Sequence, residues 1–363
     1  MDDAHGQLSA EGDPEGGAER LMRPLHVMGG GLAGLALGIG LRRHDIPVQI
    51  REAGDYPRHR VCGEFLAGIR PETLQYFGIS DLFQDALRLE TTRWYRGDNL
   101  IYERQLPEPA LAISRYELDA RLSRRFHQLG GDLMQRSRVN LSENQEGVIW
   151  ATGRRRATNQ ARKRWLGLKI HAVELELTSD LELHFGRGGY IGLSRLPKHR
   201  VNICGLFELQ SSLQGRDADL ILAYLQHVGL KKLSHRLRYE SLDPATFQSV
   251  TAMDYSRHRP PPGYFCVGDC WSLMPPFTGN GMTRALEHAA VATPLLTYYA
   301  TQQMSWKEAL KGLTSDSQKT FGGRLRRAQI LHHLLLSSLG QGGVAFLARR
   351  NWLPFDQLYH ALH

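Results

Sequence analysis

The sequence has few cysteines, and none of them forms a pattern that indicates disulfides or a metal site. The 363-residue chain holds four, at positions 62, 204, 266 and 270, which is too few and too scattered for a disulfide framework. Cys266 and Cys270 lack the two-residue spacing of a zinc knuckle. We therefore expect a cytoplasmic protein in a reducing compartment, with no structural metal.

Long hydrophobic runs are also missing. The most apolar stretch, Leu25 to Leu41, has seventeen residues and includes six glycines, whereas a membrane-spanning helix needs about 20 residues. No basic start followed by an apolar stretch marks a targeting signal. Residues 1–20 carry six acids and one base, and we expect them to form a disordered acidic tail.

The remaining composition is that of an ordinary globular protein with an excess of positive charge. Apolar residues make up 42% and charged residues 23%, and the length suits two or three domains. Outside the acidic tail, 44 Lys and Arg stand against 31 Asp and Glu. Such a surface favours anions: a nucleic acid, an acidic membrane or a phosphate-bearing cofactor or substrate. No nucleic-acid-binding motif is present, so a nucleic-acid partner is not expected.

A glycine-rich loop near the start of the chain predicts a dinucleotide site. Gly29, Gly31 and Gly34 form G-x-G-x-x-G between an expected strand, Leu25–Met28, and a helix that begins at Leu32 and Ala33. Glycines at this spacing allow a tight turn, close approach of a pyrophosphate and close helix packing, while the helix N-terminus attracts the anion. Glu52 ends the next strand, where its carboxylate can accept ribose hydroxyls.

A second element far along the chain favours FAD over NAD. Gly268 and Asp269 follow an apolar strand, and a turn rich in Pro and Gly then leads into a helix. The aspartate can bind a ribitol hydroxyl, and the helix N-terminus can face an electron-accepting ring. The residues of this turn that we expect at the cofactor are Pro276, Gly279, Asn280, Gly281 and Met282.

With these motifs the sequence resembles the FAD-dependent oxidoreductases of the p-hydroxybenzoate hydroxylase fold, over roughly residues 24–290. Ser114–Asp119, which contains Arg115, is similar to the helix-start arginine element of that superfamily, and Ala151–Gly153 is similar to its middle cofactor contact. The resemblance implies FAD as the cofactor. NADPH or NADH as the electron donor stays open, because the aspartate-glycine pair that hydroxylases use near the basic run 154–164 is absent.

The resemblance also implies an α/β fold. A Rossmann-type FAD-binding domain is interleaved with a β-sheet substrate domain and followed by a helical C-terminal region. The expected boundaries are 21–90, 110–164 and 245–300 for the FAD domain, 91–109 and 165–244 for the substrate domain, and 301–363 for the helical region.

The segment Pro57–Phe65 distinguishes branches of this superfamily. It resembles the cysteine-glycine element that lies near the flavin in geranylgeranyl reductases, which makes Cys62 and Glu64 the catalytic candidates and Arg60 a cofactor contact. It also resembles a segment of flavin-dependent halogenases. Those enzymes additionally need a lysine and a Trp-x-Trp-x-Ile-Pro stretch, whereas this chain has no lysine before Lys163. Cys62 can equally be an ordinary buried cysteine.

The sequence thus predicts an FAD-dependent oxidoreductase that acts on a large apolar molecule, isoprenoid- or polyketide-like, by double-bond reduction or hydroxylation. The alternatives are a flavin-dependent halogenase, a nucleic-acid-binding protein and a flavoprotein without turnover. In the C-terminal region, the apolar stretches 330–339 and 344–347 stand beside Arg349, Arg350, Trp352 and Phe355. Such a region can dock on the body of the protein or lie in a membrane interface.

Overall fold

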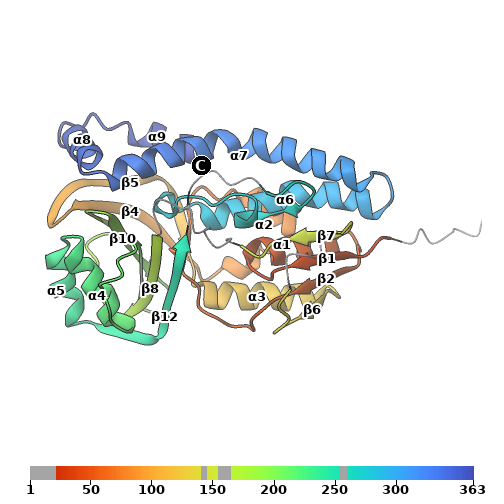
Figure 1. Ribbon diagram of the computed structural model, residues 1–363, viewed down its shortest axis with the longest axis horizontal. Helices are drawn as coiled ribbons and strands as arrows, with labels where there is room; N and C mark the ends of the chain where they lie inside the picture. Colours follow the sequence, from red (N-terminus) through yellow and green to blue (C-terminus); the bar gives the residue numbers. More distant parts are fainter. Residues whose placement is uncertain (1–21, 140–144, 154–164, 254, 256–259) are drawn as a thin grey trace, which may run out of the picture.

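The computed structural model describes residues 22–139, 145–153, 165–253, 255 and 260–363. The acidic tail and the basic run 154–164 lie outside these ranges. Two β-sheets stand next to each other, and a layer of C-terminal helices runs along both (Figure 1). This mixed architecture, a parallel sheet with helices beside a second sheet and a helical C-terminus, agrees with the expectation from the sequence.

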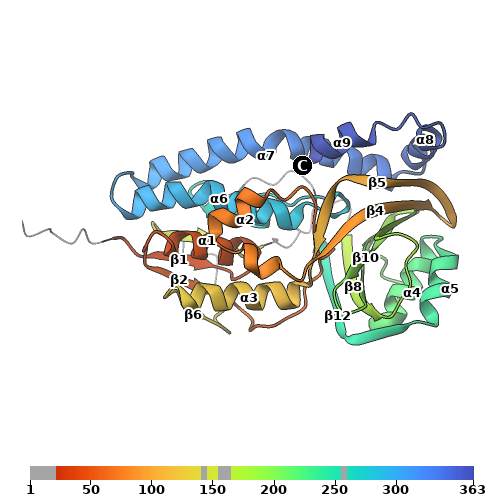
Figure 2. The ribbon, with the colours of Figure 1, turned by 180° about the vertical axis from the view of Figure 1, so that it is seen from behind.

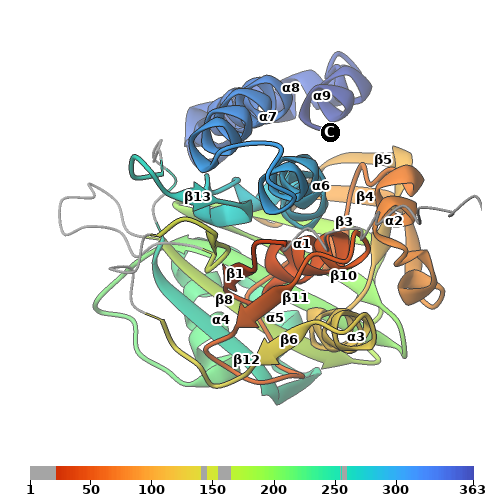
Figure 3. The same cartoon turned by 90° about the vertical axis from the view of Figure 1, so that its right-hand side faces the viewer.

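The first sheet is entirely parallel, with the strand order β13-β7-β1-β2-β6. Helix α1 (Leu32–Arg42) connects β1 to β2 and packs between α3 (Arg115–Gln128) and α6 (Gly281–Ala300) (Figure 3). The strands are β1 (Leu25–Met28), β2 (Val48–Arg51), β6 (Asp132–Met134), β7 (Val148–Trp150) and β13 (Phe265–Cys266).

Small residues allow α1 to sit in the middle of this layer. Ten of its eleven residues are buried. A Cβ on Gly34 would lie 1.9 Å from the carbonyl oxygen of Gly29, and one on Gly38 would lie 2.8 Å from the ring of Phe126 in α3. Gly40 meets Thr293 of α6 in the same way. The glycines therefore set how closely α1 approaches its neighbours, and they fix the start of α1 against the loop before it.

The second sheet has eight strands in the order β12-β8-β11-β10-β9-β4-β5-β3, and Figure 2 shows α4 and α5 lying against it at the end away from the parallel sheet. All pairs are antiparallel except β4 with β9. The strands are β3 (Phe65–Leu66), β4 (Leu87–Arg96), β5 (Asn99–Ala112), β8 (Trp165–Val173), β9 (Leu181–Gly186), β10 (Gly189–Leu196), β11 (Arg200–Glu208) and β12 (Ser241–Met253). The helices are α4 (Asp217–His227) and α5 (Lys231–Arg238).

Two details differ from the sequence-based expectation. The sequence pattern of residues 69–87 indicates one helix, but the structure has α2 (Pro71–Phe77) followed by the short η1 (Ser80–Phe83), because Gly78 takes a left-handed conformation at φ 62° and ends α2. The expected domain boundary at 244/245 falls inside β12. That strand continues past Pro244 because its pairing with β8 shifts register between Asp243 and Gln248. The proline, which has no N–H, therefore does not need to donate a hydrogen bond to β8.

The C-terminal layer consists of three helices after α6. Helix α7 (Trp306–Leu336) begins with a capping box between Ser305 and Glu308 and runs back along α6; α8 (Ser338–Arg349) and α9 (Phe355–Leu362) follow. In the described ranges no single helix is long and apolar enough to cross a membrane, although α7 and α8, bent by 98°, pass that test as a pair.

The crowding at Gly34 leads to a testable prediction. Gly34→Ala should destabilise the protein by at least about 1–3 kcal/mol, because the added methyl group overlaps the backbone at Gly29 and the helix must move. Gly31→Ala is the matched control, since no atom lies within 4 Å of an added Cβ there. Urea unfolding of both variants measures the difference. Equal stability of the two variants would show that α1 is not held by this contact.

Candidate functional site

A cleft of about 600 Å³ lies where the strands of the parallel sheet end. Its wall includes the loop after β1, Glu52 after β2, Ala151–Gly153 after β7 and Asp269 after β13. Because the carboxyl ends of parallel strands meet at one edge of a sheet, these four segments converge although they are far apart in the sequence. Of the expected cofactor contacts, those that line the cleft are Gly29, Gly31, Leu32, Ala33, Glu52, Arg60, Arg115, Gly153, Asp269, Pro276, Gly279, Gly281 and Met282.

The glycines of the cleft fall into two groups. At Gly31, Gly153 and Gly281, no atom of the described residues lies within 4 Å of an added Cβ, so these residues leave the backbone there open to a ligand. Gly29, by contrast, would clash with Ala151 and has φ 109°, which glycine alone adopts readily. The open glycines thus form a cradle, and the crowded one shapes the turn.

Two helix N-termini face this cradle. Neither α1, capped by Gly31, nor α6, capped by Asn280, receives a hydrogen bond from a capping side chain. Their first-turn N–H groups and the positive ends of their dipoles are therefore available to an anion or an electron-rich ring.

Glu52 is buried and holds the first turn together. Its Oε2 accepts the Gly30 N–H at 2.8 Å, its Oε1 accepts the Gly54 N–H at 3.0 Å, and the guanidinium of Arg60 lies 3.6 Å away. Each carboxylate oxygen can accept a second hydrogen bond. Glu52 therefore retains capacity for a ribose hydroxyl.

The two expected arginines share one buried carboxylate. Arg115 binds Asp119 with two hydrogen bonds of 2.7 and 2.8 Å, and Arg60 Nε donates to the same group at 2.9 Å. Burial opposes the charge of Arg115, but Asp119 outweighs burial and raises the pKa of the guanidinium. Arg115 therefore stays charged where it lines the cleft.

At the far end of the cleft, Asp269 lines the wall and pairs with Arg284 at 2.8 Å. Gly268 lies behind it, and its N–H donates to Nδ1 of His288 at 3.0 Å. Nε2 of His288 in turn contacts Ser317 Oγ of α7 at 2.9 Å. Burial, together with the charge of Arg284, lowers the pKa of His288 to about 3. This neutral histidine ties the Asp269 segment to α7.

Three expected cofactor contacts do not reach the cleft. Asn280 is buried, and its Nδ2 donates to the carbonyl of Leu362 in α9 at 2.7 Å. Gly34 packs against Gly29, and an added Cβ on Gly268 would lie 2.7 Å from that of Ala33. These residues hold the walls of the cleft together and do not form its surface.

Cys62 lies where the cleft meets a second cavity of about 170 Å³. The second cavity is predominantly apolar and is enclosed by the antiparallel sheet and the C-terminal helices. The residues that border both spaces are Val61, Cys62, Gly63, Phe65, Tyr255 and Pro276. A group in one space can therefore meet a group in the other at this segment.

The thiol of Cys62 has a raised pKa. Burial raises it, and the opposing charge of Arg115 does not offset burial. Arg60, two residues earlier in the sequence, is turned toward Asp119 and Glu52. Cys62 is thus a protonated thiol near neutral pH.

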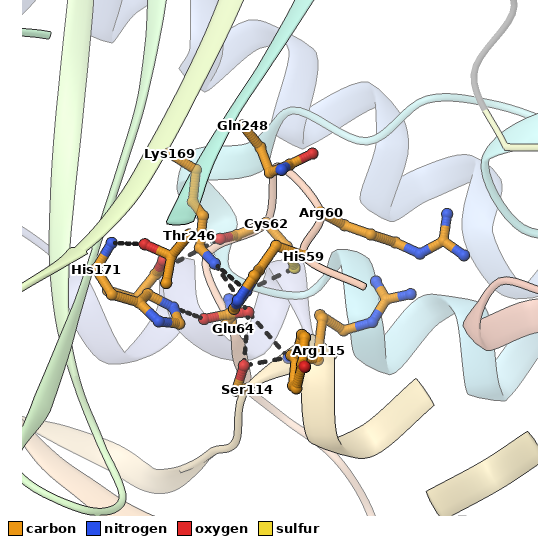
Figure 4. A network of polar contacts seen from close by, with 12 residues as sticks. His59, Arg60, Cys62, Glu64, Ser114, Arg115, Lys169, His171, Thr246 and Gln248 are labelled. Atoms are coloured by element: carbon orange, nitrogen blue, oxygen red, sulfur yellow. Dashed lines mark hydrogen bonds and ion pairs between the residues drawn. The ribbon is translucent and has the colours of Figure 1, made fainter. Parts of the chain in front are cut away.

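Glu64 sits behind Cys62 in a network of polar side chains (Figure 4). Its Oε1 accepts from Ser114 Oγ at 3.1 Å and from the Arg115 N–H at 2.9 Å, and its Oε2 accepts from His171 Nε2 at 2.6 Å. Lys169 Nζ lies 3.5 Å from Oε1. Burial raises the pKa of Glu64, but the hydrogen bond from His171 and the charge of Lys169 outweigh burial and hold the pKa below its usual value.

The Glu64 carboxylate lines neither cavity and is fully buried. It therefore has no direct access to a ligand in either space, and its place indicates a positioning role in contrast to the catalytic one expected from the sequence. Lys169 also donates to Nδ1 of His59 at 3.1 Å, and burial lowers the pKa of His59 to about 4. The amine of Lys169 is thereby engaged on both sides.

The sequence analysis missed the side chains that hold this segment from the second sheet. Lys169 and His171 alternate in the otherwise apolar strand β8, so both point toward Glu64 (Figure 4). Asn202 Nδ2 donates to the carbonyl of Cys62 at 3.0 Å, and Ser194 Oγ donates to that of Gly63 at 3.0 Å. Polar residues two apart in an apolar strand were the available signal.

No protein-family model matches the chain, and no curated protein matches it at a significant level. Solved structures do resemble it over 93% of its length. The flavin-dependent brominase Bmp2 is 16% identical with a TM-score of 0.73, over 92% of that chain. HpxO of Klebsiella pneumoniae, complexed with FAD and uric acid, is 14% identical with a TM-score of 0.69, over 97% of that chain.

A geranylgeranyl bacteriochlorophyll reductase-like protein from Thermoplasma acidophilum is 15% identical with a TM-score of 0.68, over 94% of that chain. The three proteins share their architecture with this chain. The α/β fold expected from the sequence is therefore confirmed: a Rossmann-type domain with an adjoining β-sheet domain and a helical C-terminal region.

The neutral state of His288 predicts a pH dependence of stability. The unfolded chain binds a proton at this histidine below pH 6.5, whereas the folded protein resists protonation down to a pKa of about 3. Unfolding therefore takes up a proton in this range, and the stability contributed by His288 falls as the pH falls, by about 1.4 kcal/mol per pH unit.

Urea unfolding of the wild type and of His288→Asn across this range tests the point. The variant should be less stable above pH 6.5, where the hydrogen bonds are lost without compensation. The difference should shrink as the pH falls toward 3. A difference that does not change with pH would mean that His288 does not resist protonation in the folded protein.

Proposed function

We propose that this chain is an FAD-dependent oxidoreductase that binds FAD non-covalently in the 600 Å³ cleft. The observation that carries the proposal is the cradle of open backbone at Gly31, Gly153 and Gly281, set against two uncapped helix N-termini. A pyrophosphate needs such backbone access and such a dipole. Neighbours of the same fold include a protein complexed with FAD.

Different residues of the cleft would bind different parts of FAD. Gly31 and the start of α1 would take the pyrophosphate, Glu52 would take the ribose, and Asp269 would take a ribitol hydroxyl. Gly281, at the start of α6, would face the ring. Bound FAD would supply electron transfer, and the protein would supply position, electrostatics and exclusion of water.

The second cavity supports an apolar substrate. A dry cavity of about 150 Å³ holds a benzene ring, so the 170 Å³ here suits one ring-sized or isoprenoid-sized end of a longer molecule. Tyr190 and Asn202 line this cavity. Within the described part of the chain, the hydroxyl of Tyr190 and Oδ1 of Asn202 are buried without a hydrogen-bond partner. A hydroxyl or amine on a substrate that reached these atoms would satisfy them.

The protonated thiol of Cys62 favours reduction over hydroxylation. Reduction of a carbon–carbon double bond needs a proton in addition to the electron pair, and Cys62 holds a proton where the two spaces meet. A geranylgeranyl reductase-like neighbour is compatible with this assignment. Hydroxylation, in which the substrate carbon gains an oxygen atom instead of a hydrogen atom, is the alternative.

Halogenation is the second alternative, because a brominase shares the fold. The sequence has no lysine before position 163, but the fold brings Lys169 of β8 beside the Cys62–Glu64 segment. Its amine lines neither cavity and is engaged by Glu64 and His59. This engagement supports the reductase over the halogenase.

Anaerobic reduction of the purified protein, followed by air, separates these reactions. The oxidised protein should show flavin absorption, and NADPH and NADH are the two electron donors to compare. A reductase should transfer its electrons to an alkene substrate without oxygen. Product that forms only after air is admitted, with an oxygen atom incorporated, would replace the reductase by the hydroxylase.

Loss of FAD is the expected result of filling the cradle. Gly31→Val should keep the fold, because the position is open and has an ordinary φ of −77°, but should give colourless protein because the side chain occupies the place of the pyrophosphate. Gly343→Val, at an equally open glycine in α8, is the control and should stay yellow. Full FAD occupancy in Gly31→Val would refute this use of the loop.

The role of Cys62 is tested by a change that keeps its volume. Cys62→Ser should retain bound, reducible FAD and should lose at least about a hundredfold in turnover per bound flavin, the usual contribution of a general acid. Cys266→Ser changes a buried thiol that lines neither the cleft nor the apolar cavity, and should leave turnover per bound flavin nearly unchanged. Undiminished turnover in Cys62→Ser would remove the thiol from the reaction.

A further inference from the structure

Large apolar side chains are exposed together at the junction of α7 and α8. Five of the thirteen such side chains in the described part of the chain fall between residues 330 and 352, at exposures of 45–91%. We call them the C-terminal apolar patch: Ile330, Leu334, Leu339, Phe346 and Trp352. Phe355, which the sequence placed in the same group, is buried and docks on the body instead. A cluster of this kind marks an interaction surface.

A basic hollow of about 660 Å³ adjoins this patch and shares Phe346 with it. Four arginines line the hollow: Arg96 at the end of β4, Arg187 in the turn after β9, and Arg349 and Arg350 at the end of α8. No acidic residue of the described ranges lines it. Among the described residues, no ion pair joins any of these four guanidinium groups to a carboxylate. The hollow is therefore a site for anions.

Apolar patch and basic hollow form one surface. The guanidinium of Arg350 lies over the ring of Phe346 at 4.7 Å and over that of Trp352 at 5.2 Å. In Figure 1 this surface lies at the end of the molecule marked by α8, away from the parallel sheet. Asp98, two residues after Arg96, does not line the hollow: its carboxylate accepts the backbone N–H of Lys232 at the start of α5.

We propose that this surface docks the protein on a bilayer that contains anionic phospholipids. Arginines bind lipid phosphates, and tryptophan, phenylalanine and leucine side chains insert at the boundary between head groups and acyl chains. A second copy of the chain would fit poorly in a symmetric contact through this surface, because neither the hollow nor the apolar patch offers an acidic side chain to the four arginines. Nucleic acid would leave the apolar patch without a partner.

The surface also lies next to the apolar cavity. Helix α8 presents Phe346 outward, while Val344, two residues earlier, lines the cavity together with Leu353. A substrate dissolved in the membrane would thus start one helix away from the site. This last step rests on the proposed function, whereas membrane docking itself does not.

Co-sedimentation with vesicles tests the docking surface in the full-length, FAD-loaded protein. The wild type should bind vesicles of phosphatidylcholine with phosphatidylserine more tightly than vesicles of phosphatidylcholine alone, and salt should weaken the binding. Arg187→Gln with Arg349→Gln should lower the partition coefficient about twentyfold, at about fivefold per arginine. Phe346→Ser with Trp352→Ser should lower it at least tenfold.

Two single variants are the matched controls. Tyr298→Ser removes an exposed aromatic ring on α6, at 47% exposure, and Arg88→Gln removes an exposed arginine of β4, at 66%. Neither should change vesicle binding. Three outcomes would each overturn the proposal. They are failure of the wild type to bind vesicles, binding of both double variants as tightly as the wild type, and a loss of vesicle binding in the controls as large as that in the double variants.

Two further measurements exclude other occupants. Inorganic phosphate at the total lipid phosphate concentration should not release the protein from vesicles; complete release would show that the hollow binds free phosphate and would overturn docking. Light scattering should give the same mass for the wild type and Phe346→Ser with Trp352→Ser; loss of a dimer would identify a contact between copies. Absence of vesicle binding with FAD still bound would leave the proposed function intact.

Discussion

The buried carboxylate of Glu64 joins three parts of the molecule that are remote in the sequence. The carboxylate accepts hydrogen bonds from Ser114 and Arg115 at the start of α3. It also contacts His171 and Lys169 of strand β8 in the second sheet. An isolated buried charge would cost several kcal/mol, so these partners must all be in place when the protein folds. Their arrangement fixes Cys62 and Gly63 at the one position where both cavities meet.

The two sheets serve this segment in different ways. The parallel sheet gathers loops at its carboxyl edge and so builds a cleft from backbone and from helix N-termini. The antiparallel sheet contributes side chains: its apolar positions form the wall of the second cavity, while Asn202 and Ser194 hold the carbonyl groups of Cys62 and Gly63. The cleft, which is lined largely by backbone, and the second cavity, which is lined by side chains, meet at the segment Val61–Gly63.

Features that depend on local spacing could be predicted from the sequence, and features that depend on distant pairing could not. Gly29, Gly31 and Gly34 follow from one turn between one strand and one helix, and Glu52 from the next strand. The contacts of Lys169 and His171 with Glu64 cannot be predicted locally, because Glu64 lies about a hundred residues earlier in the chain and meets them only when β8 packs against its loop. Asn280 stands next to glycines that line the cleft, but the docking of α9 draws its side chain away. The pKa of Cys62 likewise depends on burial that no local pattern reveals.

Helix α7 has 31 residues, which at 1.5 Å per residue makes a rod of about 46 Å. One end carries Ile330 and Leu334 of the exposed patch, and its middle holds Ser317, which reaches Gly268 through His288. One helix thus carries part of the exposed patch and also contacts the residues behind the wall of the cleft. The two hydrogen bonds of His288 link that helix to the Asp269 segment.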